Sequence, residues 1–248
     1  MEWNIPQKPF RIYGNTYYVG THGLSSVLIT SDTGHVLIDG ALPESVPHIV
    51  ENIRTLGFRI EDIKLIVNSH AHYDHAGGIA ELQRLSGARI AASPWTAAVM
   101  TNGTVPRDDP QFGIIGPIAK VAQVESLRDN ETFHVGAVAV TAHFTPGHTP
   151  GGTSWTWKSC ENDRCLNLVY ADSLTPVSAD GFLFSRNHIS FAPSYAFLES
   201  TPCDILITPH PGPANGSIDP TACRTLAATG RDQLRKRLAT ERTTSDRK

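Results

Sequence analysis

A cluster of histidines and one aspartate directly after an apolar run constrains this chain more than any other feature. Residues 63–67 read IKLIV, which is typical of a buried β-strand, and residues 70–75 read HAHYDH. In extended backbone His70, His72 and Asp74 project to the same side, while His75 lies where the sequence AGGIAEL begins a helix. We therefore expect a strand that leads into a loop of metal-binding side chains, with room for two neighbouring metal ions.

The residue types in this cluster indicate a metal site that retains water. Structural zinc sites usually take four protein ligands, mostly cysteines, whereas histidine and carboxylate ligands suit sites that keep a coordination position open. A histidine-rich surface loop, or a structural zinc site completed by a distant residue, is the alternative. Two further histidines favour the open type of site, because His148 follows the turn sequence TPG and His210 follows the strand-like sequence ILITP.

The motif HAHYDH resembles the signature of the metallo-β-lactamase superfamily. Residues 145–152 (TPGHTPGG), 170–175 (YADSLT) and 208–211 (TPHP) are similar to the subclass B3 β-lactamases, and the resemblance extends over nearly the whole chain. It implies an α/β fold, the four-layer αββα sandwich, in which helices cover the outer faces of two mixed sheets. It also implies zinc-dependent hydrolysis of the amide of penicillins, cephalosporins and carbapenems by a metal-bound hydroxide, and hence antibiotic resistance.

The resemblance assigns roles to particular residues. It implies two zinc ions, the first held by His70, His72 and His148 and the second by Asp74, His75 and His210. Asp74 would also be catalytic, because it would orient the hydroxide. Ser173 and Thr175 resemble the pair of hydroxyls that binds the substrate carboxylate, although ordinary turn hydrogen bonding is the alternative for them. Gln111, in a long loop that flanks the substrate pocket in the family, is a further candidate contact.

Two rival functions remain open. The first is another hydrolase of the same superfamily, a glyoxalase II-like thioesterase or a lactonase, in which an aspartate bridges the two metals; Asp172 could fill that role. We favour the interpretation in which Ser173 occupies this position and no carboxylate bridges, because residues 171–175 and the cysteine pairs match the B3 enzymes better. The second rival is a non-enzymatic zinc-binding module, which would have little use for an open coordination position.

Length and charge limit the architecture and the partners. A chain of 248 residues fits one layered α/β domain, residues 1–248, of which we expect 240–248 to form a disordered tail. A net charge of −3 argues against a nucleic-acid partner. No run approaches the roughly 18 apolar residues of a membrane span, so we expect no membrane partner either. The expected partner is a small-molecule β-lactam, bound by a monomer.

Four cysteines indicate an exported protein. Their spacing matches no zinc-binding pattern, so disulfides are the natural interpretation, and disulfides persist in oxidising compartments. Cys160 and Cys165 would close the end of a hairpin, which leaves Cys203 and Cys223 to join the last strand to the last helix. We therefore expect a periplasmic protein whose signal peptide is absent from this sequence. Four reduced cysteines in a cytoplasmic enzyme are the alternative.

Periodicity and turn residues predict the order of the elements. We expect an opening set of strands at residues 11–13, 16–19, 26–29 and 35–38, a helix over 43–56, the strand 63–67, a helix up to about 86, a strand at 88–92 and a short helix over 94–100. Residues 101–120 lack any sustained period and predict a long loop. A second set of strands is expected at 132–134, 138–143, 153–157 and 166–170, followed by the strand 205–207 and a helix over 220–239.

Overall fold

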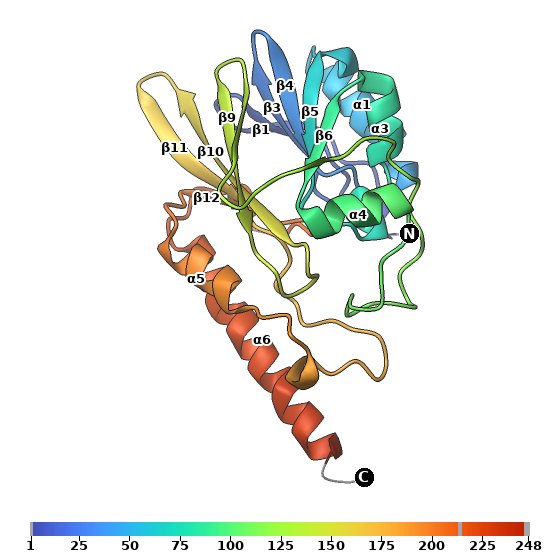
Figure 1. Cartoon of the computed structure of the whole chain (residues 1–248). Coiled ribbons are helices and arrows are strands. Elements are labelled where there is room, and N and C mark those ends of the chain that lie inside the picture. The colour runs from blue at the N-terminus through green and yellow to red at the C-terminus, as the bar shows by residue number, and fades with distance from the viewer. Residues whose placement is uncertain (1, 213–214, 246–248) are drawn as a thin grey trace.

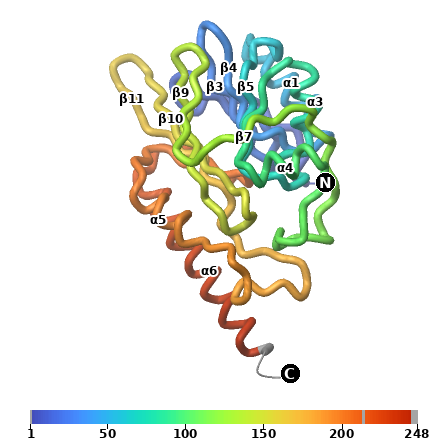
Figure 2. Tube along the Cα trace, viewed as in Figure 1, coloured from blue at the N-terminus to red at the C-terminus, as the bar shows by residue number. Residues whose placement is uncertain are grey.

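Two β-sheets packed face to face form the centre of the molecule. The computed structural model describes residues 2–212 and 215–245. Within these residues the strands form one mixed sheet of seven strands and one of five (Figure 1). Helices pack on the outer side of each sheet (Figure 2). The predicted αββα sandwich is therefore confirmed.

The seven-stranded sheet changes from antiparallel to parallel pairing across its width. The first four strands pair antiparallel, whereas each strand from the fifth onward pairs in parallel with the strand before it, after a connection that contains a helix. In hydrogen-bonded order the strands are β1 (Phe10–Tyr13), β2 (Thr16–Tyr18), β3 (Val27–Ser31), β4 (Gly34–Ile38), β5 (Ile63–Val67), β6 (Arg89–Ala92) and β7 (Glu125–Ser126).

The five-stranded sheet is antiparallel except at one edge, where β11 and β12 pair in parallel. In hydrogen-bonded order its strands are β12 (Ile205–Ile207), β11 (Arg164–Tyr170), β10 (Thr153–Glu161), β9 (Val138–Phe144) and β8 (Thr132–Val135). All the strands predicted for this sheet are present within two residues of the expected bounds, except that β10 continues four residues further, to Glu161.

Alternation along the strands separates the apolar residues into three cores. On β5, Leu65 and Val67 face the other sheet, whereas Ile66 faces the helices, since successive side chains of a strand point to opposite faces. One core therefore lies between the seven-stranded sheet and its helices, a second lies between the two sheets, and a third lies between the five-stranded sheet and its helices. A strand buried on both faces explains why residues 63–67 are apolar at four of five positions.

Each sheet has its own group of helices. On the seven-stranded sheet lie α1 (Val46–Thr55), α3 (Ile79–Ser86) and α4 (Pro94–Asn102), and on the five-stranded sheet lie α5 (Ala192–Ser200) and α6 (Ala222–Ser245). The shorter helical segments are α2 (Tyr73–Ala76), η1 (Glu2–Asn4), η2 (Pro43–Ser45), η3 (Ile60–Asp62) and η4 (Phe184–Arg186). Among the described residues no helix is both long enough and apolar enough to cross a membrane.

The last helix corrects the expectation of a disordered tail over residues 240–248. α6 continues to Ser245, well beyond the expected end at 239, while residues 246–248 lie outside the described part of the chain. Glu241 explains the difference, because this buried carboxylate accepts hydrogen bonds from the backbone nitrogens of Phe184 (3.0 Å) and Ser185 (2.9 Å) and from Arg237 Nε (2.9 Å). These tertiary contacts stabilise the last turns of a helix whose apolar pattern has already ended.

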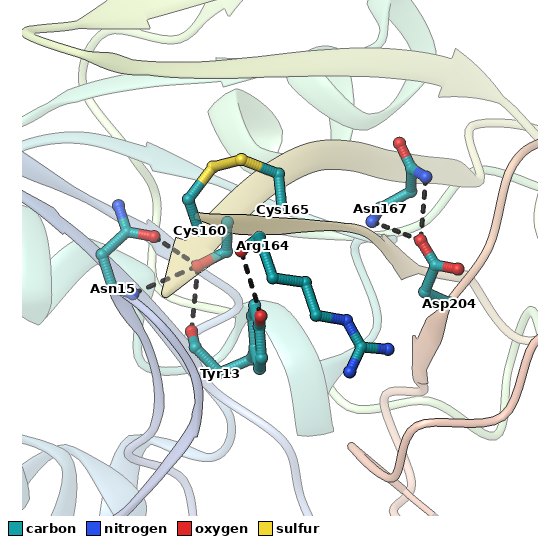
Figure 3. Close-up of a disulfide and its surroundings, with 8 residues drawn as sticks. Tyr13, Asn15, Cys160, Arg164, Cys165, Asn167 and Asp204 are labelled. Carbon is teal, nitrogen blue, oxygen red and sulfur yellow. Dashed lines mark hydrogen bonds between the residues drawn. A yellow bond between two sulfur atoms is a disulfide. The ribbon is translucent and has the colours of Figure 1, made fainter. Parts of the chain in front are cut away.

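Both expected disulfides are present, and they join the expected cysteines. Cys160 and Cys165 join β10 to β11 at the end of their hairpin, where Tyr13 Oη also donates a hydrogen bond to the Arg164 carbonyl at 3.0 Å (Figure 3). Cys203 and Cys223 join the segment before β12 to α6. All four cysteines are thereby paired.

The second disulfide should contribute more to stability than the first. It closes a loop with a sequence separation of 20 residues against 5, and a longer loop loses more chain entropy when it is cross-linked. Replacing Cys203 and Cys223 together by serine should lower the free energy of unfolding by about 3 kcal/mol, against about 2 kcal/mol for Cys160 and Cys165. Denaturant unfolding measures both, and equal losses for the two pairs would contradict this ranking.

Candidate metal centre

Three histidines from the two sheets meet at one edge of the sandwich. His70 and His72 lie just beyond the end of β5, and His148 lies in the turn between β9 and β10. All three are buried. One ring nitrogen of each histidine lies within 4.8 Å of one ring nitrogen of each of the other two. The strands end at the same edge, so a turn of one sheet is brought against a loop of the other, although His72 and His148 are 76 positions apart in the sequence.

Each of these histidines has one ring nitrogen engaged by an oxygen. His70 Nδ1 lies 2.7 Å from Asp172 Oδ1, His72 Nε2 lies 3.1 Å from Asp109 Oδ2, and His148 Nδ1 lies 2.8 Å from the Thr175 carbonyl. An ionised carboxylate or a carbonyl only accepts, so in a neutral ring the engaged nitrogen donates and the other nitrogen carries the lone pair. The tautomers that this pattern selects present His70 Nε2, His72 Nδ1 and His148 Nε2 as acceptors.

The buried Nε2 atom of His70 indicates that a cation binds in this group. Its Nε2 atom is buried and has no hydrogen-bond partner among the described residues. Leaving such a group unsatisfied is costly, and metal-ligating histidines commonly direct their second nitrogen to a carboxylate or a carbonyl. Three neutral imidazoles arranged in this way match the donor set of a catalytic zinc site, in which three protein ligands leave one position open.

Asp74, His75 and His210 form a second group beside the first. Asp74 Oδ2 lies 3.2 Å from His75 Nε2 and 3.2 Å from His210 Nε2, and the rings of His70 and His75 are 4.4 Å apart between centroids. Asp74 and His75 belong to α2, which begins at Tyr73. The expectation that Asp74 alternates with His70 and His72 along an extended strand is therefore wrong, because the chain has already turned into a helix, and Asp74 instead joins the second group.

The exposed histidine of this group, His210, is held by neighbours distant in the sequence. The residue follows the end of β12, and its side chain is 42% exposed. The ring lies 4.8 Å from that of His75 and 4.9 Å from that of Trp3, and its Nδ1 atom lies 3.3 Å from the Gly23 carbonyl. The N-terminal segment thus limits the movement of a ligand that would otherwise sit on a loose loop.

Comparisons with known proteins agree with this geometry. The sequence profile of the metallo-β-lactamase superfamily matches residues 19–160. The chain belongs to the metallo-β-lactamase superfamily. A subclass B3 metallo-β-lactamase from a soil metagenome library, MEM-A1, has 45% identity and a TM-score of 0.94, and the match covers 98% of this chain and 99% of that one. The Rm3 metallo-β-lactamase has 52% identity and a TM-score of 0.92, with 97% of each chain covered.

The structural similarity of this chain is to subclass B3 enzymes such as MEM-A1, whereas the curated sequence relatives are more distant. The N-acyl homoserine lactonase AttM of Agrobacterium fabrum is 28% identical over 52% of this chain and 57% of its own length. The chain spans only a little more than half the length of the first curated relatives it matches.

Burial influences the charge of the candidate ligands in this member of the superfamily. Burial, together with the neighbouring histidines, holds the pKa of His70 well below its ordinary value and lowers the pKa of His148 to about 3. Burial would raise the pKa of Asp74, but the charge of His75 and the hydrogen bond from His210 outweigh it and hold that pKa well below its usual range. His70 and His148 are thus neutral and Asp74 is ionised near neutral pH, which are the forms that coordinate a metal.

Two of the three residues predicted to contact the substrate, Gln111 and Thr175, lie beside the first group. Gln111 Nε2 lies 3.2 Å from His148 Nε2 and 3.5 Å from His72 Nδ1. Thr175 is exposed, and it uses its carbonyl to hold His148. Ser173 is half-buried next to Asp172. Gln111 and Thr175 thus lie against a candidate ligand, and Ser173 directly follows Asp172, which contacts His70; contact of these residues with a substrate stays a prediction.

Asp39 lies beneath the metal loop, and the sequence analysis did not identify it. This fully buried carboxylate accepts hydrogen bonds from Asn68 Nδ2 (2.8 Å), from the Ser69 backbone nitrogen and hydroxyl (2.7 Å each), and from Tyr170 Oη (2.7 Å). It therefore fixes the backbone immediately before His70. The available signal was an aspartate directly after the apolar strand β4, at the edge of the sheet where β5 also ends.

Proposed function

We propose that this chain hydrolyses the amide of β-lactam antibiotics with two zinc ions, one in each ligand group. The observation that carries the proposal is the pair of adjacent groups, His70, His72 and His148 beside Asp74, His75 and His210, on a backbone similar over 97% or more of the chain to those of MEM-A1 and Rm3. Bound zinc would supply Lewis-acid polarisation of the amide carbonyl and activation of a water molecule.

The protein residues would act by orienting these groups. Asp172, Asp109 and the Thr175 carbonyl fix the rings of the first group, and rigid ligands keep the reacting atoms in place. One carboxylate oxygen of Asp74 meets both histidines of the second group, which leaves its other oxygen to orient a water molecule. The described residues would therefore position both the ligands and a water molecule for hydrolysis of the amide.

Substrate binding would use the hydroxyls of Ser173 and Thr175 and the amide of Gln111. A β-lactam antibiotic carries a carboxylate near the scissile amide, and hydroxyl and amide groups can donate hydrogen bonds to it without adding a charge. Support comes from the hydrogen bond between the Ala179 nitrogen and the Pro110 carbonyl at 2.8 Å, which joins the two loops that carry these residues.

The position of Asp172 favours this function over a thioesterase or a lactonase. A bridging aspartate would have to meet ligands of both groups, but Asp172 Oδ1 is engaged by His70 Nδ1 on the side away from the free Nε2. Asp172 belongs to neither candidate group among the described residues. The lactonase AttM is also less similar to this chain than MEM-A1 and Rm3 are.

We further propose that the protein is an exported, monomeric resistance enzyme of the periplasm. The two disulfides support export, since such bonds persist in oxidising compartments.

A panel of three substrates tests the function. With zinc present, the purified protein should hydrolyse a carbapenem with a kcat/KM about two orders of magnitude or more above that for an N-acyl homoserine lactone or S-lactoylglutathione, because the pocket rim would be arranged for the β-lactam carboxylate. The loss of carbapenem absorbance and product formation from the other two substrates provide the rates. Rapid hydrolysis of the lactone or the thioester without hydrolysis of the carbapenem would overturn the proposal.

A further inference from the structure

The long loop between α4 and β7 contains a fully buried carboxylate. Residues 103–124 contain no helix or strand, yet Asp109 in this loop is 0% exposed, whereas the adjacent Asp108 is exposed. Burying an ionised group in a loop is costly unless hydrogen bonds compensate for the lost water. The partners of Asp109 therefore indicate what its burial achieves.

Asp109 binds two parts of the site at once. Its Oδ1 atom accepts a hydrogen bond from the Gln111 backbone nitrogen at 2.7 Å and lies 3.3 Å from His72 Nε2, while Oδ2 lies 3.1 Å from the same His72 nitrogen. The side chain of Gln111 in turn lies 3.2 Å from His148 Nε2. One carboxylate thus contacts both a candidate ligand of the first zinc and the backbone of a candidate substrate contact.

We propose that Asp109 is a positioning residue that couples the first metal group to Gln111. This inference rests on the proposed function only for the role of Gln111, because the effect on the metal can be measured without any substrate. A metal that fixes the ring of His72 also fixes Asp109, and through it the turn that carries Gln111. Loss of the carboxylate should therefore affect zinc affinity and substrate binding together.

The chemistry of a carboxylate explains why asparagine cannot replace it. Both partners of Asp109 are N–H groups, and a carboxylate accepts from both, whereas an asparagine side chain offers one acceptor and one donor. The backbone nitrogen of Gln111 can only donate, so in Asp109→Asn it would keep its hydrogen bond to the side-chain oxygen of the asparagine. The amide nitrogen then faces His72 Nε2 and selects the tautomer with the proton on Nδ1, which removes the lone pair needed for the metal.

The adjacent aspartate supplies a matched control. Asp108 is exposed, and its carboxylate accepts a hydrogen bond from Trp95 Nε1 at 3.2 Å, away from both ligand groups. Asp108→Asn makes the same chemical change one position earlier in the same loop. Asp109→Ala is a further variant, since it removes the acceptor without placing a donor against His72.

Zinc affinity, measured by competition with a chromophoric chelator, is the main readout. Asp109→Asn should lower the affinity of the first zinc about 10- to 100-fold, at least as much as Asp109→Ala, although asparagine preserves the shape of the side chain. Asp109→Ala should also raise KM for a carbapenem, because Gln111 loses its backbone partner. Asp108→Asn should match the wild type in both measurements.

Other outcomes separate this inference from the proposed function. Wild-type zinc affinity in Asp109→Asn would overturn the coupling, as would variants that lose only thermal stability. A weaker effect of asparagine than of alanine on zinc affinity would indicate a space-filling role and would also overturn it. Failure of the wild-type protein to hydrolyse any β-lactam would refute the proposed function, while the zinc measurements would still test Asp109.

Discussion

Removal of zinc should abolish β-lactam hydrolysis, and two equivalents should restore it. Six side chains in two adjacent groups support this stoichiometry, and all six are histidine or aspartate. Without the metal, the attacking water has no activating group of comparable strength. We therefore expect the rate to fall by about a million-fold or more, toward that of the uncatalysed reaction.

Elemental analysis before and after dialysis against a chelator measures the metal, and carbapenem hydrolysis measures the activity. His70→Ala should lose the first equivalent together with the activity, whereas alanine at the exposed His188 should change neither. Full activity at a stoichiometry of one would exclude the two-ion arrangement. Activity that survives complete removal of zinc would exclude metal-dependent hydrolysis altogether.

Asp172→Ala should weaken zinc binding, whereas Ser173→Ala should weaken substrate binding. Asp172 Oδ1 lies 2.7 Å from His70 Nδ1 in a fully buried pair, so its loss leaves a buried donor unsatisfied and frees the ring of one ligand. We expect zinc affinity at the first group to fall about 10- to 100-fold. The second group should keep its zinc, because Asp172 is not among its candidate ligands.

Ser173→Ala should leave both zinc ions bound and raise KM. The loss of one hydrogen bond to a charged substrate group costs about 1–2 kcal/mol, or about a 5- to 30-fold change in KM. Zinc content and β-lactam kinetics should be measured on both variants, together with thermal unfolding to show that the fold survives. If Asp172→Ala lost both zinc ions while remaining folded, Asp172 would be the bridging ligand of the rival hydrolases.

Local sequence patterns predicted most elements of this fold. The strand at residues 63–67 was predicted with the bounds that the structure shows, because a strand buried on both faces is continuously apolar and stands out from its surroundings. The short helix α5 was not predicted. Its buried Tyr195 and Leu198 form too brief a pattern by themselves, and the helix depends on packing within the core that it shares with α6.

The sequence by itself determined which side chains are the candidate ligands. His70, His72 and His75 are close in the chain, and His148 and His210 follow strand ends, so residue type and local context were sufficient to single them out. Tertiary structure decided how these ligands are held. Asp172 reaches His70 across 102 positions and Asp109 reaches His72 across 37. No local pattern encodes such pairs, because a hydrogen bond between distant segments exists only once both sheets have packed and excluded water.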